Sequence, residues 1–271
     1  MKAAIYQLSC PKSFDDVIKG LAQDEDHKVI AGGQSLGAML NLRLARPNHL
    51  LDLSSIEELT SIKVLDEQLV IGAMVTHATL EDMGMQDHML GFMGHVARGI
   101  AYRAVRNCGT IGGSLCHADP AADWVSALSV LDATLDIRGP NGQRSVAIAA
   151  FMKSAFETDL GQDEVLVSIT IPRLKPGTKW SYRKYCRKTG EFALAIVAAI
   201  LDPERESLRL VFGALDGAPV ISSDAALFRR ATDGDDLADV TAAFKHRLTE
   251  QQANLHEQLL IQVRSDLGVQ S

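Results

Sequence analysis

Two paired-glycine segments constrain the fold of this chain more than any other feature. Residues 31–35 read AGGQS, and residues 109–114 read GTIGGS. The first segment follows a short apolar run and precedes residues 36–45, in which leucine and methionine recur at helical spacing. This order predicts a strand, a tight turn and a helix. Successive glycines let the backbone adopt positive φ and approach a ligand closely. Each segment is therefore either an anion-binding loop at the start of a helix or a tight turn with a structural role.

The composition excludes several classes of protein. The chain has 34 acidic and 27 basic residues and a net charge of -7, whereas nucleic-acid binding needs a concentrated basic surface. The longest unbroken apolar run, residues 192–201, is about half the length of a membrane span. No apolar signal-peptide core is visible near the N-terminus, so we expect a cytoplasmic location. The four cysteines lack the close spacing of zinc or iron–sulfur ligands, and we expect no metal site in this chain.

The periodicity predicts an α+β chain up to a linker at Pro172 and residues 176–177. Ser35 stands at the N-cap of the helix that follows the first glycine segment, and Asp119 with Pro120 is expected to open a helix that runs to about Leu131. The other expected elements are an amphipathic helix over 13–21, strands at 29–31 and 50–53, two short strands within 62–74, a helix start at 77–81, helical structure over 88–107, a hairpin over 133–148 and a strand over 166–171.

Beyond the linker, the pattern predicts an antiparallel sheet followed by helices. The three expected strands are residues 180–185, 192–201 and 208–214, and residues 224–267 are helical by composition and spacing. The first strand alternates, and its two faces carry Trp180, Tyr182 and Lys184 on one side and Ser181, Arg183 and Tyr185 on the other.

No familiar catalytic signature is present. The chain lacks G-x-G-x-x-G, the P-loop, the G-x-S-x-G elbow and H-E-x-x-H. His117 adjoins the second glycine segment, but no partner nucleophile can be named for it, so we predict no catalytic side chain.

Two further positions are candidates for ligand contact. Asp123 lies one turn beyond Asp119, where its carboxylate either accepts hydrogen bonds from a ligand such as a ribose hydroxyl or favours the helix dipole. Lys184 belongs to a basic run around Tyr185, which is either a solvated strand edge or a contact with a bound anion or ring.

Taken together, these segments resemble the FAD-binding medium subunit of molybdenum hydroxylases, the group that contains carbon monoxide dehydrogenase and xanthine dehydrogenase-like enzymes. Residues 31–53 and 106–124 carry the resemblance, and residues 182–198 add a weaker match. The resemblance implies an α+β fold of the vanillyl-alcohol-oxidase (PCMH) type. It divides the chain into an FAD-binding domain, 1–172, with lobes of about 1–56 and 57–172, and a C-terminal domain, 178–271, of a small antiparallel sheet and helices.

The resemblance also implies which residues bind the cofactor. Asp123 corresponds to an aspartate that contacts the ribityl or ribose portion of FAD, and Lys184 and Tyr185 lie near the flavin. The two loops expected at the pyrophosphate comprise Ala31, Gly32, Gly33, Gln34, Ser35 and Leu36, and Thr110, Ile111, Gly112, Gly113 and Ser114.

On this interpretation the chain transfers electrons. The molybdenum cofactor of a large subunit would oxidise the substrate, and two [2Fe–2S] clusters of a small subunit would deliver the electrons to FAD in this chain. An external acceptor would then reoxidise the FAD: a quinone, NAD, oxygen or a carrier protein. The expected assembly is a dimer of heterotrimers. The alternatives are a free-standing flavin-dependent oxidoreductase of the same fold and a non-enzymatic module whose loops hold no flavin.

Overall fold

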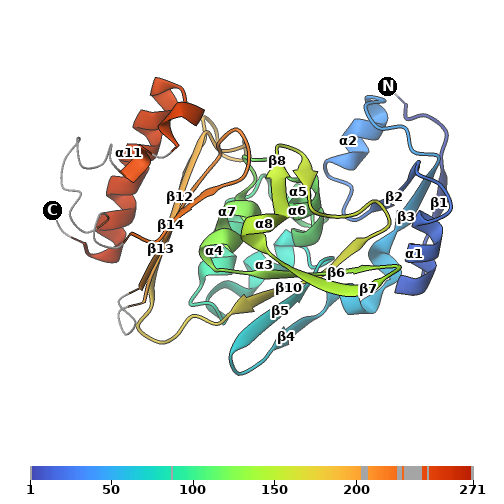
Figure 1. Cartoon of the computed structure of the whole chain (residues 1–271), viewed down its shortest axis with the longest axis horizontal. Helices are drawn as coiled ribbons and strands as arrows, with labels where there is room; N and C mark the ends of the chain where they lie inside the picture. Colours follow the sequence, from blue (N-terminus) through green and yellow to red (C-terminus); the bar gives the residue numbers. More distant parts are fainter. Residues whose placement is uncertain are drawn as a thin grey trace.

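The computed structural model describes residues 2–269 except 87, 203–206, 225–227, 229–239 and 243. The three larger sheets follow one another along the molecule, in the order of the sequence (Figure 1). The N-terminal sheet and the C-terminal helix stand at opposite ends, and the middle sheet with its helices lies between them. No helix in the described ranges is long and apolar enough to cross a membrane.

The N-terminal lobe is a small parallel sheet with its crossover helices. Its strands lie in the order β1-β3-β2, and both pairings are parallel. Ser13 caps the first helix by accepting a hydrogen bond from the backbone of Asp16, which confirms the amphipathic helix predicted there. The elements are β1 (Gln7–Ser9), α1 (Phe14–Leu21), β2 (His27–Ile30), α2 (Leu36–Asn41) and β3 (His49–Asp52).

The middle lobe is built on an antiparallel sheet in the order β4-β5-β10-β6-β7. The predicted strand pair within 62–74 and the predicted hairpin over 133–148 are both present. The strands are β4 (Ile62–Val64), β5 (Gln68–Gly72), β6 (Thr134–Gly139), β7 (Gly142–Ala147) and β10 (Val165–Pro172), with a small hairpin of β8 (Met152–Ser154) and β9 (Glu157–Thr158). The helices are α3 (His77–Met83), α4 (Phe92–Arg98), α5 (Arg103–Arg106), α6 (Ile111–His117), α7 (Asp123–Val130) and α8 (Ile148–Phe151). Short 3-10 turns occur at Leu53–Ser55, Glu57–Thr60, Gly84–Gln86 and Lys245–Arg247.

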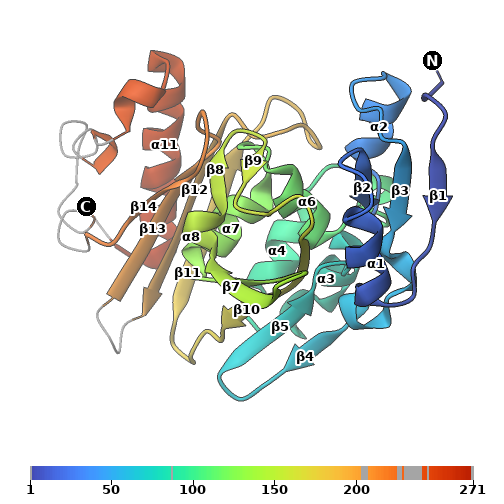
Figure 2. The same cartoon turned by 45° about the vertical axis from the view of Figure 1, so that its right-hand side comes forward.

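The C-terminal sheet packs between α7 of the middle lobe and the last helix (Figures 1 and 2). Its central strand is buried on both faces for this reason. The antiparallel order is β11-β12-β13-β14, with β11 (Lys179–Tyr185), β12 (Ala195–Asp202), β13 (Ser207–Gly213) and β14 (Val220–Ser222), and the helix is α11 (Glu250–Leu267). The three predicted strands are confirmed, although the second starts at Ala195 rather than 192. The fourth strand was not predicted.

Some predicted helices are wrong in extent. The helix expected from Asp119 begins only at Asp123, because the Asp119 carboxylate accepts a hydrogen bond from the backbone of Ala121 and closes a turn instead. The helical structure expected over 88–107 divides into α4 and α5, separated by a turn in which Ala101 has φ +42°. Within the helical prediction for 224–267, α11 is confirmed, and residues 225–227 and 229–239 lie outside the described residues.

Candidate functional site

The first glycine loop joins β2 to α2 and leaves backbone donors unused. In the described structure, the N–H groups of Gly32, Gly33, Gln34 and Ser35 make no hydrogen bond within the chain. Gly33 has φ +68°, a conformation that a side chain would strain. Ser35 does occupy the predicted N-cap position, but its side chain makes no capping bond. The loop therefore offers consecutive N–H groups and a serine hydroxyl at the start of a helix, which suits an anion.

The second glycine loop is arranged differently. Its N–H groups are engaged inside the protein: Ile111 donates to Val75, Gly112 to Ala73, and Ser114 to Thr110. The Thr110 side chain caps α6 by accepting from Gly113 at 3.0 Å. The N–H groups of residues 111–114 are therefore already used inside the protein. Position 112 requires glycine for a steric reason, since a Cβ there would lie 2.5 Å from the Cβ of Ala73.

The two loops touch each other although about 80 residues separate them. A Cβ on Gly32 would lie 1.8 Å from the carbonyl oxygen of Cys108, just before the second loop. A Cβ on Gly113 would lie 3.3 Å from that of Ala31. The absence of side chains at these positions lets the N-terminal and middle lobes meet backbone to backbone. The structure thus brings the two predicted loops into one site.

His77 and Trp124, which the sequence did not single out, lie behind the second loop. The buried Trp124 Nε1 donates to His77 Nδ1 at 3.0 Å, and the backbone of His77 donates to the Gly109 carbonyl at 2.9 Å. Burial lowers the pKa of His77 to about 4, with the nearby Arg106 charge adding to the effect. The imidazole is consequently neutral at pH 7.

A buried ion pair supports the chain just before this loop. Arg106 donates from Nε to Glu81 at 2.7 Å and from Nη1 to the carbonyls of Ile100 and Ala101. The hydrogen bond from Arg106 is the main cause that lowers the pKa of Glu81. This pair ties α5 to α3 and fixes the path of the chain into Cys108.

Asp123 is buried and joins the middle lobe to the C-terminal sheet. Its carboxylate accepts hydrogen bonds from Lys184 Nζ at 2.9 Å and from the Tyr182 hydroxyl at 2.9 Å. Lys184 also donates to the carbonyl of Gly99 at 2.7 Å. Burial, followed by the negative charge of Asp123, raises the pKa of Tyr182. The predicted strand alternation placed Tyr182 on the same face as Lys184, and this was the available signal for the contact.

The other face of β11 binds α11, and Ser181 and Arg183 share that face as the alternation predicted. Ser181 and Arg183 both donate to Asp266, with the Arg183 Nη2 2.7 Å from the carboxylate. Tyr185 ends the strand with its side chain 43% exposed and takes part in none of the loop contacts above. The exposed ring of Tyr102 lies against Gly190, where a Cβ would be 2.8 Å from the ring.

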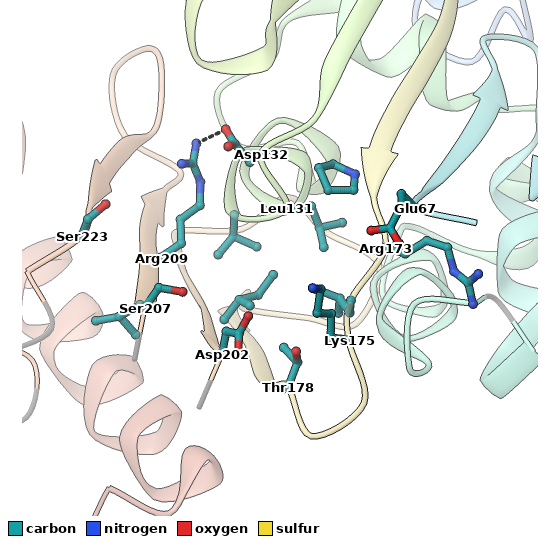
Figure 3. A pocket seen from close by; sticks show the side chains of 15 residues that line it. Glu67, Leu131, Asp132, Arg173, Lys175, Thr178, Asp202, Ser207, Arg209 and Ser223 are labelled. Carbon is teal, nitrogen blue, oxygen red and sulfur yellow. Dashed lines mark ion pairs between the residues drawn. The ribbon is translucent and has the colours of Figure 1, made fainter. Parts of the chain in front are cut away.

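A cavity of about 490 Å³ lies elsewhere, between the end of α7, the linker after β10 and the C-terminal sheet (Figure 3). Arg209 lines it and pairs with Asp132 at 2.8 Å, while Lys175, Thr178 and Asp202 stand around the opposite side. None of the predicted site residues lines this cavity.

Comparison with known proteins identifies the family. Residues 4–174 match the family described as FAD binding domain in molybdopterin dehydrogenase. The nicotine 6-hydroxylase medium subunit of Paenarthrobacter nicotinovorans is 34% identical over 218 residues, covering 80% of this chain and 76% of that protein. The carbon monoxide dehydrogenase medium chain of Hydrogenophaga pseudoflava is 36% identical over 197 residues, covering 72% and 69%. The crystal structure of quinoline 2-oxidoreductase from Pseudomonas putida 86 superposes over 100% of both chains with a TM-score of 0.87 and 31% identity.

The chain therefore belongs to the family of FAD-binding domains of molybdopterin dehydrogenases. It is an oxidoreductase flavoprotein subunit of the molybdenum hydroxylase type, and the resemblance found in the sequence is confirmed. The α+β fold, with its C-terminal antiparallel sheet and helix, is that of these relatives.

Proposed function

We propose that this chain is the FAD-binding electron-transfer subunit of a molybdenum hydroxylase or dehydrogenase complex, and that its two glycine loops hold the FAD diphosphate. The contact between Gly32 and Cys108 carries the proposal, because it joins two loops from different lobes into one surface of polar backbone. The division into an FAD-binding domain, 1–172, and a C-terminal domain, 178–271, is part of the proposal, and the family match over residues 4–174 supports it.

The first loop would supply most of the donors to the diphosphate. The N–H groups from Gly32 to Ser35 are unused within the described structure, and the Ser35 hydroxyl does not cap α2. Ala31 and Leu36 bound this loop. In the second loop the backbone donors are engaged, so we assign its contribution to the Ser114 hydroxyl and to the close approach that Gly113 permits beside Thr110. Ile111 and Gly112 would act by packing, since both are buried.

The remaining candidates lie at the junction with the C-terminal sheet. Asp123 would contact the ribityl or ribose portion of FAD while still held by Lys184 and Tyr182, since a carboxylate accepts up to about four hydrogen bonds. Lys184 would thereby bring positive charge toward the flavin. Tyr185, exposed at the end of β11, is the proposed neighbour of the isoalloxazine.

The proposed partners are a large subunit with the molybdenum cofactor and a small subunit with [2Fe–2S] clusters, assembled as a dimer of heterotrimers. Relatives named as medium subunits or chains of nicotine 6-hydroxylase and carbon monoxide dehydrogenase support the presence of a large and a small partner subunit. When bound, FAD supplies the redox chemistry that links electrons from the clusters to an external acceptor. The protein binds and orients the cofactor and supplies no acid or nucleophile.

Purification of the native complex tests this function. We expect the chain to copurify with two partner subunits, one larger and one smaller. The purified complex should contain molybdenum, iron and FAD in a fixed ratio and have the mass of a dimer of heterotrimers. A homogeneous protein that contains FAD, lacks molybdenum and iron and oxidises a substrate directly would instead establish the free-standing oxidoreductase. A native assembly without flavin would contradict the FAD assignment itself.

A further inference from the structure

We propose that His77 is a positioning residue for the cofactor loops: Trp124 fixes its imidazole in the neutral form, and the ring supports Gly109 where the two loops meet. Acid would then release FAD by protonating His77. This inference rests on the proposed binding of FAD by the loops.

The backbone around His77 is the template for the second loop. His77 donates to the Gly109 carbonyl at 2.9 Å, and the preceding Thr76 forms an isolated antiparallel bridge with Thr110. Residues 73–75 accept the next two N–H groups of the loop. Any movement of this segment therefore moves the loop directly, because three backbone hydrogen bonds join the two.

The His77 side chain occupies the space directly behind Gly109. A Cβ on Gly109 would lie 2.9 Å from Cδ2 and 3.0 Å from Nε2 of the imidazole. On its other side Gly109 adjoins Cys108, whose carbonyl meets Gly32 of the first loop. The imidazole thus lies one residue from the contact between the lobes, packed against the loop from inside the protein.

Trp124 fixes the protonation state of His77. An indole N–H can only donate, so the 3.0 Å bond to Nδ1 requires a lone pair on that nitrogen and places the proton of the neutral ring on Nε2. The Trp124 side chain is fully buried, and Nε1 is its only hydrogen-bonding atom. Protonation of Nδ1 would set two N–H groups against each other in the interior.

The charged groups on the surrounding elements oppose protonation. Arg106 on α5 is the nearest positive charge, and it pairs with Glu81 one turn along α3 from His77. Arg103 pairs with Asp82 at 2.6 Å, and Asp123, next to Trp124, is held by Lys184. The carboxylates of Glu81, Asp82 and Asp123 are therefore each already paired with a cation.

The sign of the pH effect follows from these contacts. The pKa of His77 falls from 6.5 to about 4 on folding, so the unfolded or loosened state binds a proton more readily than the native state. The arrangement is fully stable above pH 6.5 and weakens progressively as the pH falls from 6.5 to about 4. A buried histidine with only a packing role would lower thermal stability when replaced, but it would not set the pH at which FAD leaves.

The test measures FAD dissociation and tryptophan fluorescence of the full chain, with its partners where these copurify, from pH 7.5 to 4. For the wild type we expect FAD affinity to fall at least about tenfold over the acid part of this range, together with a change in tryptophan emission. His77→Gln should bind FAD about tenfold more weakly at pH 7 and show little further loss on acidification. His117→Gln, near the same loop but against Phe156, is the matched control and should behave as the wild type.

Trp124→Phe keeps the proposal testable if His77→Gln does not fold. Without the indole donor, Nδ1 is free to take a proton, so the midpoint of FAD release should move to higher pH. An unchanged midpoint in Trp124→Phe, or wild-type pH dependence in His77→Gln, would overturn the role of His77. Failure of the wild type to bind FAD at any pH would contradict the proposed function, and the emission midpoint of the flavin-free chain would still report whether His77 titrates as proposed.

Discussion

Replacement of Gly32 by alanine tests the contact between the two loops. The added Cβ would lie 1.8 Å from the carbonyl oxygen and 2.5 Å from the carbonyl carbon of Cys108, whereas ordinary contact begins near 3.4 Å. Both obstructing atoms are backbone, so the first loop must withdraw from the second. Overpacking of this kind costs ~1–3 kcal/mol, and displacement of a binding group by ~1 Å can cost ~10²-fold. We expect the Kd for FAD to rise about 30-fold, which corresponds to ~2 kcal/mol.

Flavin fluorescence titration of the full chain measures this effect, with Gly37→Ala as the control. A Cβ on Gly37 meets nothing within 4 Å, and the residue lies in α2, where alanine is favoured over glycine by ~1 kcal/mol. Gly37→Ala should therefore bind FAD as the wild type does, with equal or higher thermal stability. If Gly32→Ala retained wild-type affinity, the loops would not act as one site, and the reasoning from their contact would be wrong.

Three further sets of variants separate binding from stability. Gly33→Asp should abolish FAD binding without unfolding the chain, because it brings a carboxylate against the diphosphate at a partly exposed position. The same change at the buried Gly112 should unfold the lobe. Flavin content measures the loss of binding, and circular dichroism measures the loss of structure. Asp123→Ala should lower the free energy of unfolding by ~3 kcal/mol, because Lys184 loses its partner in a mostly buried site. The double variant with Lys184→Met should recover part of this stability, as measured by urea denaturation. Glu81→Gln should lower the free energy of unfolding by about 2 kcal/mol in the same assay, because Arg106 is 8% exposed and would lose its carboxylate partner.

Much of the fold could be predicted because its signals are local. Ser13 caps α1 from within the same turn, and the alternation from Trp180 to Tyr185 describes two faces that the structure buries against different elements. The glycine pairs predicted a close approach of the backbone, and the backbone of Gly32 does approach that of Cys108 closely. The resemblance to the family depended on the two glycine segments and, more weakly, on residues 182–198.

The contacts that complete the site are tertiary and left no local signal. In the second loop, the N–H groups of Ile111 and Gly112 donate to Val75 and Ala73, which follow β5 without any distinctive composition. Asp123 meets Lys184 across 61 positions of sequence. Asp119 failed as a helix start because its carboxylate reached a closer donor on Ala121. In each case a competing partner decided the outcome, and its position depended on the assembled fold.

An experimental structure of the FAD-loaded complex tests the central claim most directly. We predict that the diphosphate lies within hydrogen-bonding distance of the N–H groups of residues 32–35 and of the Ser35 or Ser114 hydroxyl, at the contact between Gly32 and Cys108. A diphosphate bound elsewhere, for instance in the cavity beside Arg209 and Lys175, would contradict it.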